Sequence, residues 1–156
     1  ADLAKKAQQV AVHAIEALDG VGLFGVELFL CADGQILVNE IAPRTHNSGH
    51  HTIEACDTDQ FEQHIRAVLG LPLGSTELLR PAALVNLLGA DAGSGKPKVH
   101  GLSEALAISG VHVHLYGKRL TKPYRKMGHA TALGATQKEA MEKARQARDL
   151  LRIQPA

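Results

Sequence analysis

Apolar residues recur in the first part of the chain at the spacing of a helix that buries one face. Between residues 2 and 18 they fall three or four positions apart, and Gly20 follows as a stop signal. The members of this apolar face are Leu3, Ala7, Val10, Ala11, Ala14, Ile15 and Leu18. The pattern therefore predicts an amphipathic helix over residues 2–18.

Residues 21–41 carry two apolar runs, rich in Val, Ile, Leu and Phe, on either side of Asp33-Gly34. Such a pair between apolar runs is typical of a hairpin with a two-residue loop. A polar loop is expected over residues 42–52, and a second helix is expected to open at Thr58 and to end at Gly70 and Pro72. The residues expected to face inward from this helix are Phe61, Ile65, Val68 and Leu69.

The rest of the chain alternates short apolar runs with turn residues. The expected elements are a strand over 82–88, a Gly/Ser/Pro linker over 93–97, a short helix over 102–107, and antiparallel strands over 111–116 and 126–133. Thr136 and Glu139 form a capping box, which predicts a last helix over 137–151. The order is mixed α+β, and we expect two domains, residues 1–75 and 76–156.

Two glutamates occupy matching positions on the predicted hairpin. Glu27 precedes Asp33-Gly34 by as many residues as Glu40 follows it, so a two-residue loop would place them opposite each other. Their Cβ atoms would then lie roughly 4.5–5.5 Å apart. Apolar neighbours on both strands suggest that both faces are covered, which makes two ionised carboxylates costly. A divalent cation such as Mg²⁺, or a shared proton, would explain the pair. A slipped register with one glutamate in a surface ion pair is the alternative.

The polar loop that follows the second strand contains several groups suited to binding. Arg44 offers a planar fork for phosphate or carboxylate. His46, Asn47 and Ser48 can form directional hydrogen bonds to a small polar substrate. Since the loop leaves the strand that holds Glu40, we expect these groups to converge on the same metal. A solvated surface loop is the alternative.

Charge and composition exclude several classes of protein. Seventeen basic and sixteen acidic residues give a net charge of +1, and aromatic residues are only 3%, so no nucleic-acid-binding surface is expected. The basic cluster over residues 118–126 suits a single phosphate. Two cysteines without a CxxC pair, no signal peptide and no long apolar run predict a cytoplasmic protein that does not enter the membrane. A start inside a helical pattern suggests part of a longer chain.

The residues around the glutamate pair resemble a known family. The hairpin is similar to the metal-binding hairpin of the ATP-grasp superfamily. The run NEIAPRTHNSGH, residues 39–50, resembles the signature of the 5-(carboxyamino)imidazole ribonucleotide synthases, the ATPase subunits of phosphoribosylaminoimidazole carboxylase. The similarity continues through FEQHIRAVLGLPLG, PAALVNLLG and HLYGKRLTKPYRKMGH. It implies the C-terminal half of an ATP-grasp domain followed by a small α+β C-terminal domain.

This resemblance implies a reaction in which ATP and bicarbonate carboxylate aminoimidazole ribonucleotide, giving ADP and phosphate. Residue by residue, it assigns Glu27 and Glu40 to Mg²⁺, with Mn²⁺ as the alternative ion, and Asn39 with Glu40 to ATP. It assigns catalysis to Arg44, His46 and Asn47, where Arg44 stabilises charge on the transferred phosphoryl group. The remaining assigned residues bind the substrate, and the last three take its 5′-phosphate: Ser48, Lys118, Arg125 and Lys126.

The chain also departs from the family pattern. Ala42 stands where many ATP-grasp enzymes have an Asn ligand, and no nucleotide lysines or Gly-rich loop precede the hairpin. We therefore expect a fragment that is inactive alone and needs the N-terminal part of the same enzyme. A homodimer and a partner mutase are further partners that the resemblance suggests. The alternatives are another ATP-grasp ligase, such as a formate-dependent glycinamide ribonucleotide transformylase or a biotin carboxylase, or a non-catalytic interaction or dimerisation module.

Overall fold

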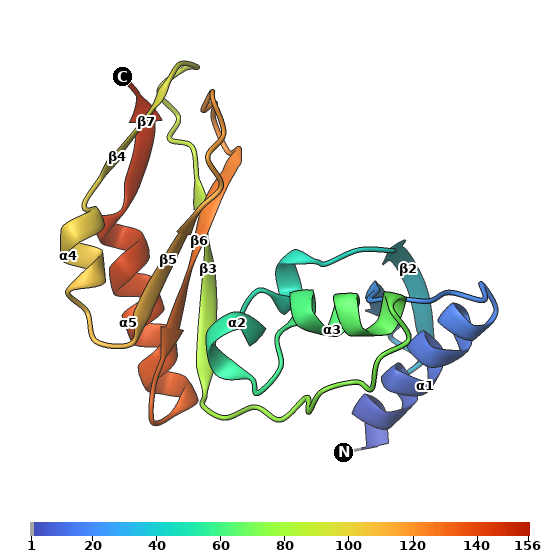
Figure 1. Cartoon of the computed structure of the whole chain (residues 1–156). Coiled ribbons are helices and arrows are strands. Elements are labelled where there is room, and N and C mark those ends of the chain that lie inside the picture. The colour runs from blue at the N-terminus through green and yellow to red at the C-terminus, as the bar shows by residue number, and fades with distance from the viewer. Residues whose placement is uncertain (1) are drawn as a thin grey trace. The chain divides into compact units, whose positions relative to one another are not determined.

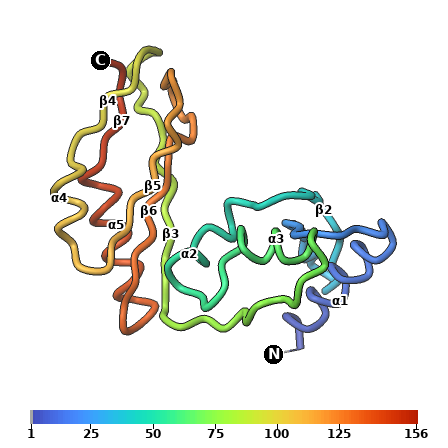
Figure 2. The backbone as a smooth tube through the Cα atoms, in the orientation of Figure 1, coloured from blue at the N-terminus to red at the C-terminus, as the bar shows by residue number. Residues whose placement is uncertain are grey.

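A computed structural model describes residues 2–156, and the predicted α+β class is confirmed (Figure 1). The chain divides into two compact units. The first unit runs to Thr52 and includes Asp57–Thr76, and the second consists of Ile53–Cys56 and Glu77–Ala156. Figure 2 traces the backbone through the elements of each unit. No helix among the described residues is both long and apolar enough to span a membrane.

The first unit contains three helical elements and one hairpin: α1 (Asp2–Glu16), β1 (Gly25–Leu30), β2 (Ile36–Ala42), the 3-10 turn η1 (Asn47–Gly49) and α3 (Gln60–Val68). The predicted first helix is confirmed, and α1 contacts β2. The middle of its predicted apolar face is half-buried, whereas Leu3 and Leu18 at its ends are exposed. The hydrophobic period therefore identified the buried side of this helix correctly.

The hairpin turn differs from the prediction. Cys31 N donates to Gln35 O at 2.9 Å, and Gly34 N donates to Cys31 O at 3.0 Å, so the loop contains Ala32 as well as Asp33-Gly34. Gly34 has a φ of +85°, the left-handed conformation that such a loop requires at its last position. The prediction of a two-residue loop is therefore wrong, and the strand register next to the turn is shifted by one residue from the predicted register.

A β-bulge farther along the hairpin cancels this shift. Leu28 pairs with Val38 and Glu27 pairs with Glu40, which leaves Asn39 as the extra residue of β2. The expected opposition of Glu27 and Glu40 is thus confirmed, although the reasoning that predicted it missed two compensating irregularities. The bulge, and not the turn alone, sets the register of the glutamate pair.

Two expectations about burial in this unit are wrong. The faces of the hairpin are not both covered within residues 2–156, because Phe29, Leu30, Leu37 and Val38 are exposed. The apolar residues predicted to face inward from α3 are also exposed. That helix begins at Gln60 and not at Thr58, because Asp59 Oδ1 accepts from the N–H groups of Phe61 and Glu62 at 2.7 and 2.9 Å.

The second unit is built on a three-stranded antiparallel sheet in the order β3-β6-β5. Its elements are α2 (Thr52–Ala55, from Ile53 on), β3 (Ala82–Leu88), β4 (Pro97–His100), α4 (Leu102–Leu106), β5 (Val111–Leu115), β6 (Lys126–Leu133), α5 (Gln137–Leu150) and β7 (Arg152–Pro155). Helix α5 lies along one face of the sheet (Figure 1). Fully buried alanines on both elements, Ala130 and Ala132 facing Ala144 and Ala147, allow this close packing.

The predicted strands and the last helix of this unit are confirmed, apart from end residues. The short antiparallel pair β4–β7 was missed. Pro97 and Pro155 occupy the ends of these strands. A proline in a short apolar run indicates a linker rather than a strand, because it cannot donate a hydrogen bond to a neighbouring strand. Because β4 and β7 are more than fifty residues apart in the sequence, no local pattern indicates that they pair.

The predicted Thr136 cap of α5 is confirmed, although the Glu139 side chain bonds to the residue before the cap and not to the cap itself. Thr136 Oγ1 accepts from Glu139 N at 3.2 Å, and Glu139 Oε2 accepts from Ala135 N at 2.8 Å. Lys143 Nζ lies 2.8 Å from Glu139 Oε1. The hydrogen bond from Lys143, followed by the one from Ala135, holds the pKa of Glu139 below its ordinary value.

A carboxyl group whose pKa is lowered by folding stabilises the folded state above its ordinary pKa, and this stability is lost as the pH falls through the lowered value. We therefore expect Glu139→Gln to lower the melting temperature at neutral pH, and the difference from the parent chain should shrink on acidification. Glu142→Gln is the control on the same helix, because its contact with Lys138 is 3.9 Å long and exposed. Thermal unfolding across pH measures both, and a difference for Glu139→Gln that does not change with pH would contradict the assignment.

Candidate functional site

Three oxygen-bearing side chains gather at the bulge of the hairpin. Glu27 and Glu40 are direct partners across β1 and β2, so their side chains leave the same face. Asn39, the bulged residue, donates from Nδ2 to Glu27 Oε2 at 3.4 Å. The Glu27 side chain is 49% exposed, so water solvates the pair, in contrast to the buried setting that the sequence suggested. The bulge therefore brings Asn39 to the carboxylates, whereas regular pairing would have placed it on the opposite face.

His46 joins this group from the loop that follows β2. Its Nε2 lies 3.5 Å from Glu27 Oε1, and its Nδ1 lies 2.9 Å from Ser48 Oγ. Ser48 N also donates to His46 Nδ1 at 3.4 Å. Because a backbone N–H can only donate, Nδ1 is an acceptor and the neutral ring carries its proton on Nε2, facing the carboxylate. The imidazole is thus oriented as a donor toward Glu27.

Two residues that the sequence analysis did not single out hold His46 in place. A Cβ atom on Gly25 would lie 2.7 Å from His46 Cγ, so the ring occupies space that only glycine leaves open. Gln60, which is 4% exposed, accepts from His46 N at 2.8 Å through Oε1, and its Nε2 lies 2.7 Å from His50 Nδ1. Gly49 is packed against the Gln60 amide in the same way. Gln60 directly follows the helix cap Asp59, a position where polar residues are common, so the local sequence does not indicate that its side chain is buried.

Gly25→Ala should destabilise the chain by about 1–3 kcal/mol, the cost of inserting a methyl group into a filled site. If the cost arises from His46, whose Cγ and Cβ would lie 2.7 and 2.8 Å from the added methyl group, Gly25→Ala should cost far less in a His46→Gly background, because the double mutant removes both atoms. Denaturant unfolding of the two single mutants and the double mutant measures this coupling. Strictly additive effects would show that Gly25 does not make room for His46.

The other predicted residues of the loop are less tightly held. Arg44 Nη1 donates to Thr45 O at 3.0 Å, and the side chain is exposed. This bond uses one of the five guanidinium N–H donors, so the fork can still bind an anion. Asn47 begins η1, and its carbonyl accepts from His50 N at 3.2 Å. The contacts of the loop thus connect Ser48 and His46 to Glu27, whereas the side-chain hydrogen bond of Arg44 goes to its neighbour Thr45.

The predicted basic residues lie in the second unit, with Lys118 and Arg125 on the connection from β5 to β6 and Lys126 at the start of β6. Lys118 Nζ donates to Lys126 O at 2.6 Å and lies 5.7 Å from the centroid of the Tyr116 ring. Arg125 Nη1 donates to Leu120 O at 2.9 Å. Lys118 and Arg125 are therefore each held by one side-chain hydrogen bond, and all three cationic side chains keep donors for a phosphate.

The oxygen donors of the hairpin suit a hard cation. Among residues 2–156, no three His, Cys, Asp or Glu side chains come together in a way that could hold a metal ion. Two carboxylates and an amide oxygen match the preference of Mg²⁺ and Mn²⁺ for oxygen. Mg²⁺ usually retains water and phosphate oxygens in its coordination shell, so a site with few protein ligands fits this ion.

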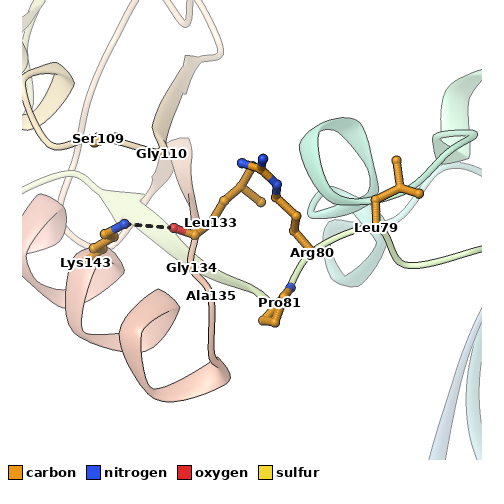
Figure 3. Close-up of a pocket in the computed structure, with 9 residues that line it drawn as sticks. All are labelled: Leu79, Arg80, Pro81, Ser109, Gly110, Leu133, Gly134, Ala135 and Lys143. Atoms are coloured by element: carbon orange, nitrogen blue, oxygen red, sulfur yellow. Dashed lines mark hydrogen bonds between the residues drawn. The ribbon is translucent and has the colours of Figure 1, made fainter.

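The second unit also contains a cavity of about 480 Å³ that involves none of the predicted site residues (Figure 3). Its lining residues are Leu79, Arg80, Pro81, Ser109, Gly110, Leu133, Gly134, Ala135 and Lys143. Lys143 donates to Leu133 O at 3.3 Å and is neutralised by Glu139, and the Arg80 side chain is exposed. The cavity therefore shares no lining residue with the candidate site.

Comparison with known proteins identifies the class of each part of the chain. Residues 1–61 match the ATP-grasp domain, and residues 82–143 match the phosphoribosylaminoimidazole carboxylase C-terminal domain. N5-carboxyaminoimidazole ribonucleotide synthase of Bacillus subtilis is 50% identical over 127 residues, which are 81% of this chain and 32% of that protein. The chloroplastic phosphoribosylaminoimidazole carboxylase of Vigna aconitifolia is 50% identical over 131 residues, 82% of this chain and 24% of that protein.

Solved structures give the same result. The N5-carboxyaminoimidazole ribonucleotide synthetase of Thermotoga maritima is 57% identical with a TM-score of 0.91, over 99% of this chain and 43% of that one. The synthase of Aspergillus clavatus in complex with ADP and 5-aminoimidazole ribonucleotide is 41% identical with a TM-score of 0.79, over 93% of this chain and 39% of that one. The chain thus combines an ATP-grasp segment with a carboxylase C-terminal domain. It belongs to the family of N5-carboxyaminoimidazole ribonucleotide synthases and spans less than half the length of these relatives.

Proposed function

We propose that this chain supplies the metal-binding hairpin, the loop Arg44–His50 and the C-terminal domain of an enzyme that carboxylates 5-aminoimidazole ribonucleotide with ATP and bicarbonate. The observation that carries this proposal is the bulge that gathers Glu27, Glu40 and Asn39 beside His46. A relative that is 50% identical is named N5-carboxyaminoimidazole ribonucleotide synthase, and a similar synthase was solved with ADP and 5-aminoimidazole ribonucleotide.

The proposed reaction has two chemical steps. In the first, an oxygen of bicarbonate attacks the γ-phosphorus of ATP, and the bond from this phosphorus to the oxygen that bridges it to the β-phosphate breaks. The products are carboxyphosphate and ADP. In the second, the 5-amino nitrogen of the ribonucleotide attacks the carboxyl carbon, the C–O bond to phosphate breaks, and the nitrogen loses one proton. Both steps depend on positioning and on stabilisation of developing negative charge.

The hairpin is proposed to hold the nucleotide phosphates. A bound Mg²⁺ or Mn²⁺ would supply positive charge that stabilises the negative charge of the nucleotide phosphates. Glu27 and Glu40 would hold this ion, and Asn39 and Glu40 would contact the nucleotide. The side chain of Asn39 is already held by its hydrogen bond to Glu27. The bulge therefore orients the proposed metal ligand Glu27 and the proposed nucleotide contact Asn39 together.

The loop is proposed to act on the reacting atoms. Arg44 would bind oxygens of the transferred phosphoryl group, because its exposed fork keeps several donors. His46 and Asn47 would orient bicarbonate, with His46 fixed between Ser48 and Glu27. Ser48 is proposed to contact the ribonucleotide. Lys118, Arg125 and Lys126 are proposed to bind its 5′-phosphate through charge-assisted hydrogen bonds.

The exposed apolar side chains of the first unit support a further part of the proposal. Phe29, Leu30, Leu37 and Val38 of the hairpin are exposed together with apolar residues of α1 and α3. Such a concentration of exposed apolar residues is typical of a surface that another part of a protein covers. We propose that the remaining ATP-grasp segment of the same enzyme covers it and supplies the missing nucleotide contacts.

The proposal is tested by measuring ATP hydrolysis that depends on both bicarbonate and aminoimidazole ribonucleotide. The 156-residue chain alone should show no such activity, whereas the chain joined to its N-terminal part should show it. Robust ATP hydrolysis by the chain alone would contradict the proposal that its nucleotide site is incomplete. A joined, folded enzyme without substrate-dependent hydrolysis would contradict the proposed function.

A further inference from the structure

A buried carboxylate in the second unit takes no part in the proposed reaction. Glu54 lies in α2, and its side chain is only 7% exposed. Its Oε1 lies 2.5 Å from His114 Nε2 on β5. Leu79 N donates to Ala55 O at 2.7 Å, which holds the last residue of α2 in place. A carboxylate is costly to bury without a charged or hydrogen-bonded partner, so the contact with His114 is what stabilises Glu54 in this position.

His114 continues the contact into the sheet. It is the direct cross-strand partner of His129 on β6, and the two imidazole rings stack with their centroids 4.5 Å apart and their planes 16° from parallel. His129 is 2% exposed. The stacked rings couple the position of His129 to that of His114, which lies beside the carboxylate. Glu54 therefore fixes the ring position of the stack.

The stack ends beside Tyr116, whose ring contacts Lys118 of the candidate phosphate site. The Tyr116 hydroxyl lies 3.0 Å from His129 Nδ1, and the two rings lie 5.8 Å apart at 53°. Burial raises the pKa of Tyr116, so the phenol stays neutral at physiological pH. The Lys118 ammonium lies 5.7 Å from the centroid of the Tyr116 ring, within the range of a cation–π contact. The Tyr116 ring thus forms part of the support for Lys118.

We propose that Glu54 is a positioning residue for Lys118, which it fixes through His114, His129 and Tyr116. The inference rests on the proposed role of Lys118 in binding the ribonucleotide 5′-phosphate. A lysine loses much side-chain conformational freedom when it is held at one point, so a supported ammonium binds phosphate more tightly than a mobile one. Loss of the support should weaken phosphate binding and leave ATP binding unchanged.

The kinetic test uses the complete enzyme with Glu54→Gln and Glu54→Ala. Each should raise the KM for aminoimidazole ribonucleotide about fivefold, with kcat and the KM for ATP nearly unchanged. Glu104→Gln, an exposed acidic residue of α4, is the matched control and should change neither KM. In a Lys118→Met background, Glu54→Gln should add little further effect, because its path to the substrate is already lost. A lowered melting temperature with an unchanged KM, or additive effects in the double mutant, would overturn the proposal.

A second measurement does not depend on the reaction. Inorganic phosphate is titrated onto the 156-residue chain and followed through the amide resonances of residues 117–126. The parent chain should bind phosphate about fivefold more tightly than Glu54→Gln. Equal affinities would overturn the positioning role. If instead the complete parent enzyme lacks substrate-dependent hydrolysis while this affinity difference persists, the proposed function fails and the positioning of Lys118 stands.

Discussion

Replacing Glu40 by Gln in the complete enzyme should lower kcat by at least about 10³-fold, the scale of losing a group that stabilises transition-state charge. The substitution keeps the size of the side chain and removes a negative charge. Glu40 is opposed to Glu27 and adjacent to the bulged Asn39, so one charge is removed from a donor set that has only two carboxylates. Steady-state ATP hydrolysis at saturating bicarbonate and ribonucleotide measures the loss.

Glu62→Gln is the matched control, because Glu62 forms a surface ion pair with Arg66 on α3, with Nη2 to Oε1 at 2.6 Å. It should leave kcat unchanged, since exposed ion pairs contribute little. Raising the Mg²⁺ concentration should restore part of the activity of a Glu27→Gln variant, whose second carboxylate remains. Turnover by Glu40→Gln within about tenfold of the parent enzyme would contradict a metal role on the scale expected for it.

Arg44→Ala should lower kcat by about 10²-fold and change the KM values little. Its guanidinium is exposed and held by a single bond to Thr45 O, so it is free to strengthen its contact as charge develops on the phosphoryl oxygens. Arg44→Lys should recover only part of the loss, because an ammonium cannot bind two oxygens as a fork. Steady-state kinetics with each substrate varied in turn separate kcat from KM.

The control for Arg44 is Arg145→Ala, which removes an exposed arginine from α5. It should change neither kcat nor any KM. If Arg44→Ala raised a KM and left kcat intact, Arg44 would bind the ground state and transition state equally well, and its proposed role in the chemical step would be wrong.

The sequence predicted the elements whose pattern is strong and local. Residues 82–88 and 126–133 form strands with the expected ends, and Thr136 caps α5 as expected. These signals depend on near neighbours along the chain, such as alternation within a strand or a capping residue three positions before its partner. The register of Glu27 and Glu40 was also right, but only because the longer turn and the bulge at Asn39 offset each other.

The features that escaped prediction depend on contacts between residues far apart in the chain. Gly25 makes room for His46, and Gln60 is buried because it bonds to His46 N. Neither contact leaves a periodic signal in the sequence. The burial of α3 was mispredicted for the same reason, since an apolar face shows that a cover is needed and does not show where it comes from.

Isotope transfer tests the central claim most directly. The complete enzyme is given bicarbonate labelled with ¹⁸O, together with ATP and aminoimidazole ribonucleotide, and the released phosphate is analysed by mass spectrometry. Attack of bicarbonate on the γ-phosphorus places one bicarbonate oxygen in that phosphate, so we predict one ¹⁸O atom in each phosphate formed with carboxylated product. Phosphate whose added oxygen comes from water would contradict the proposed carboxylation.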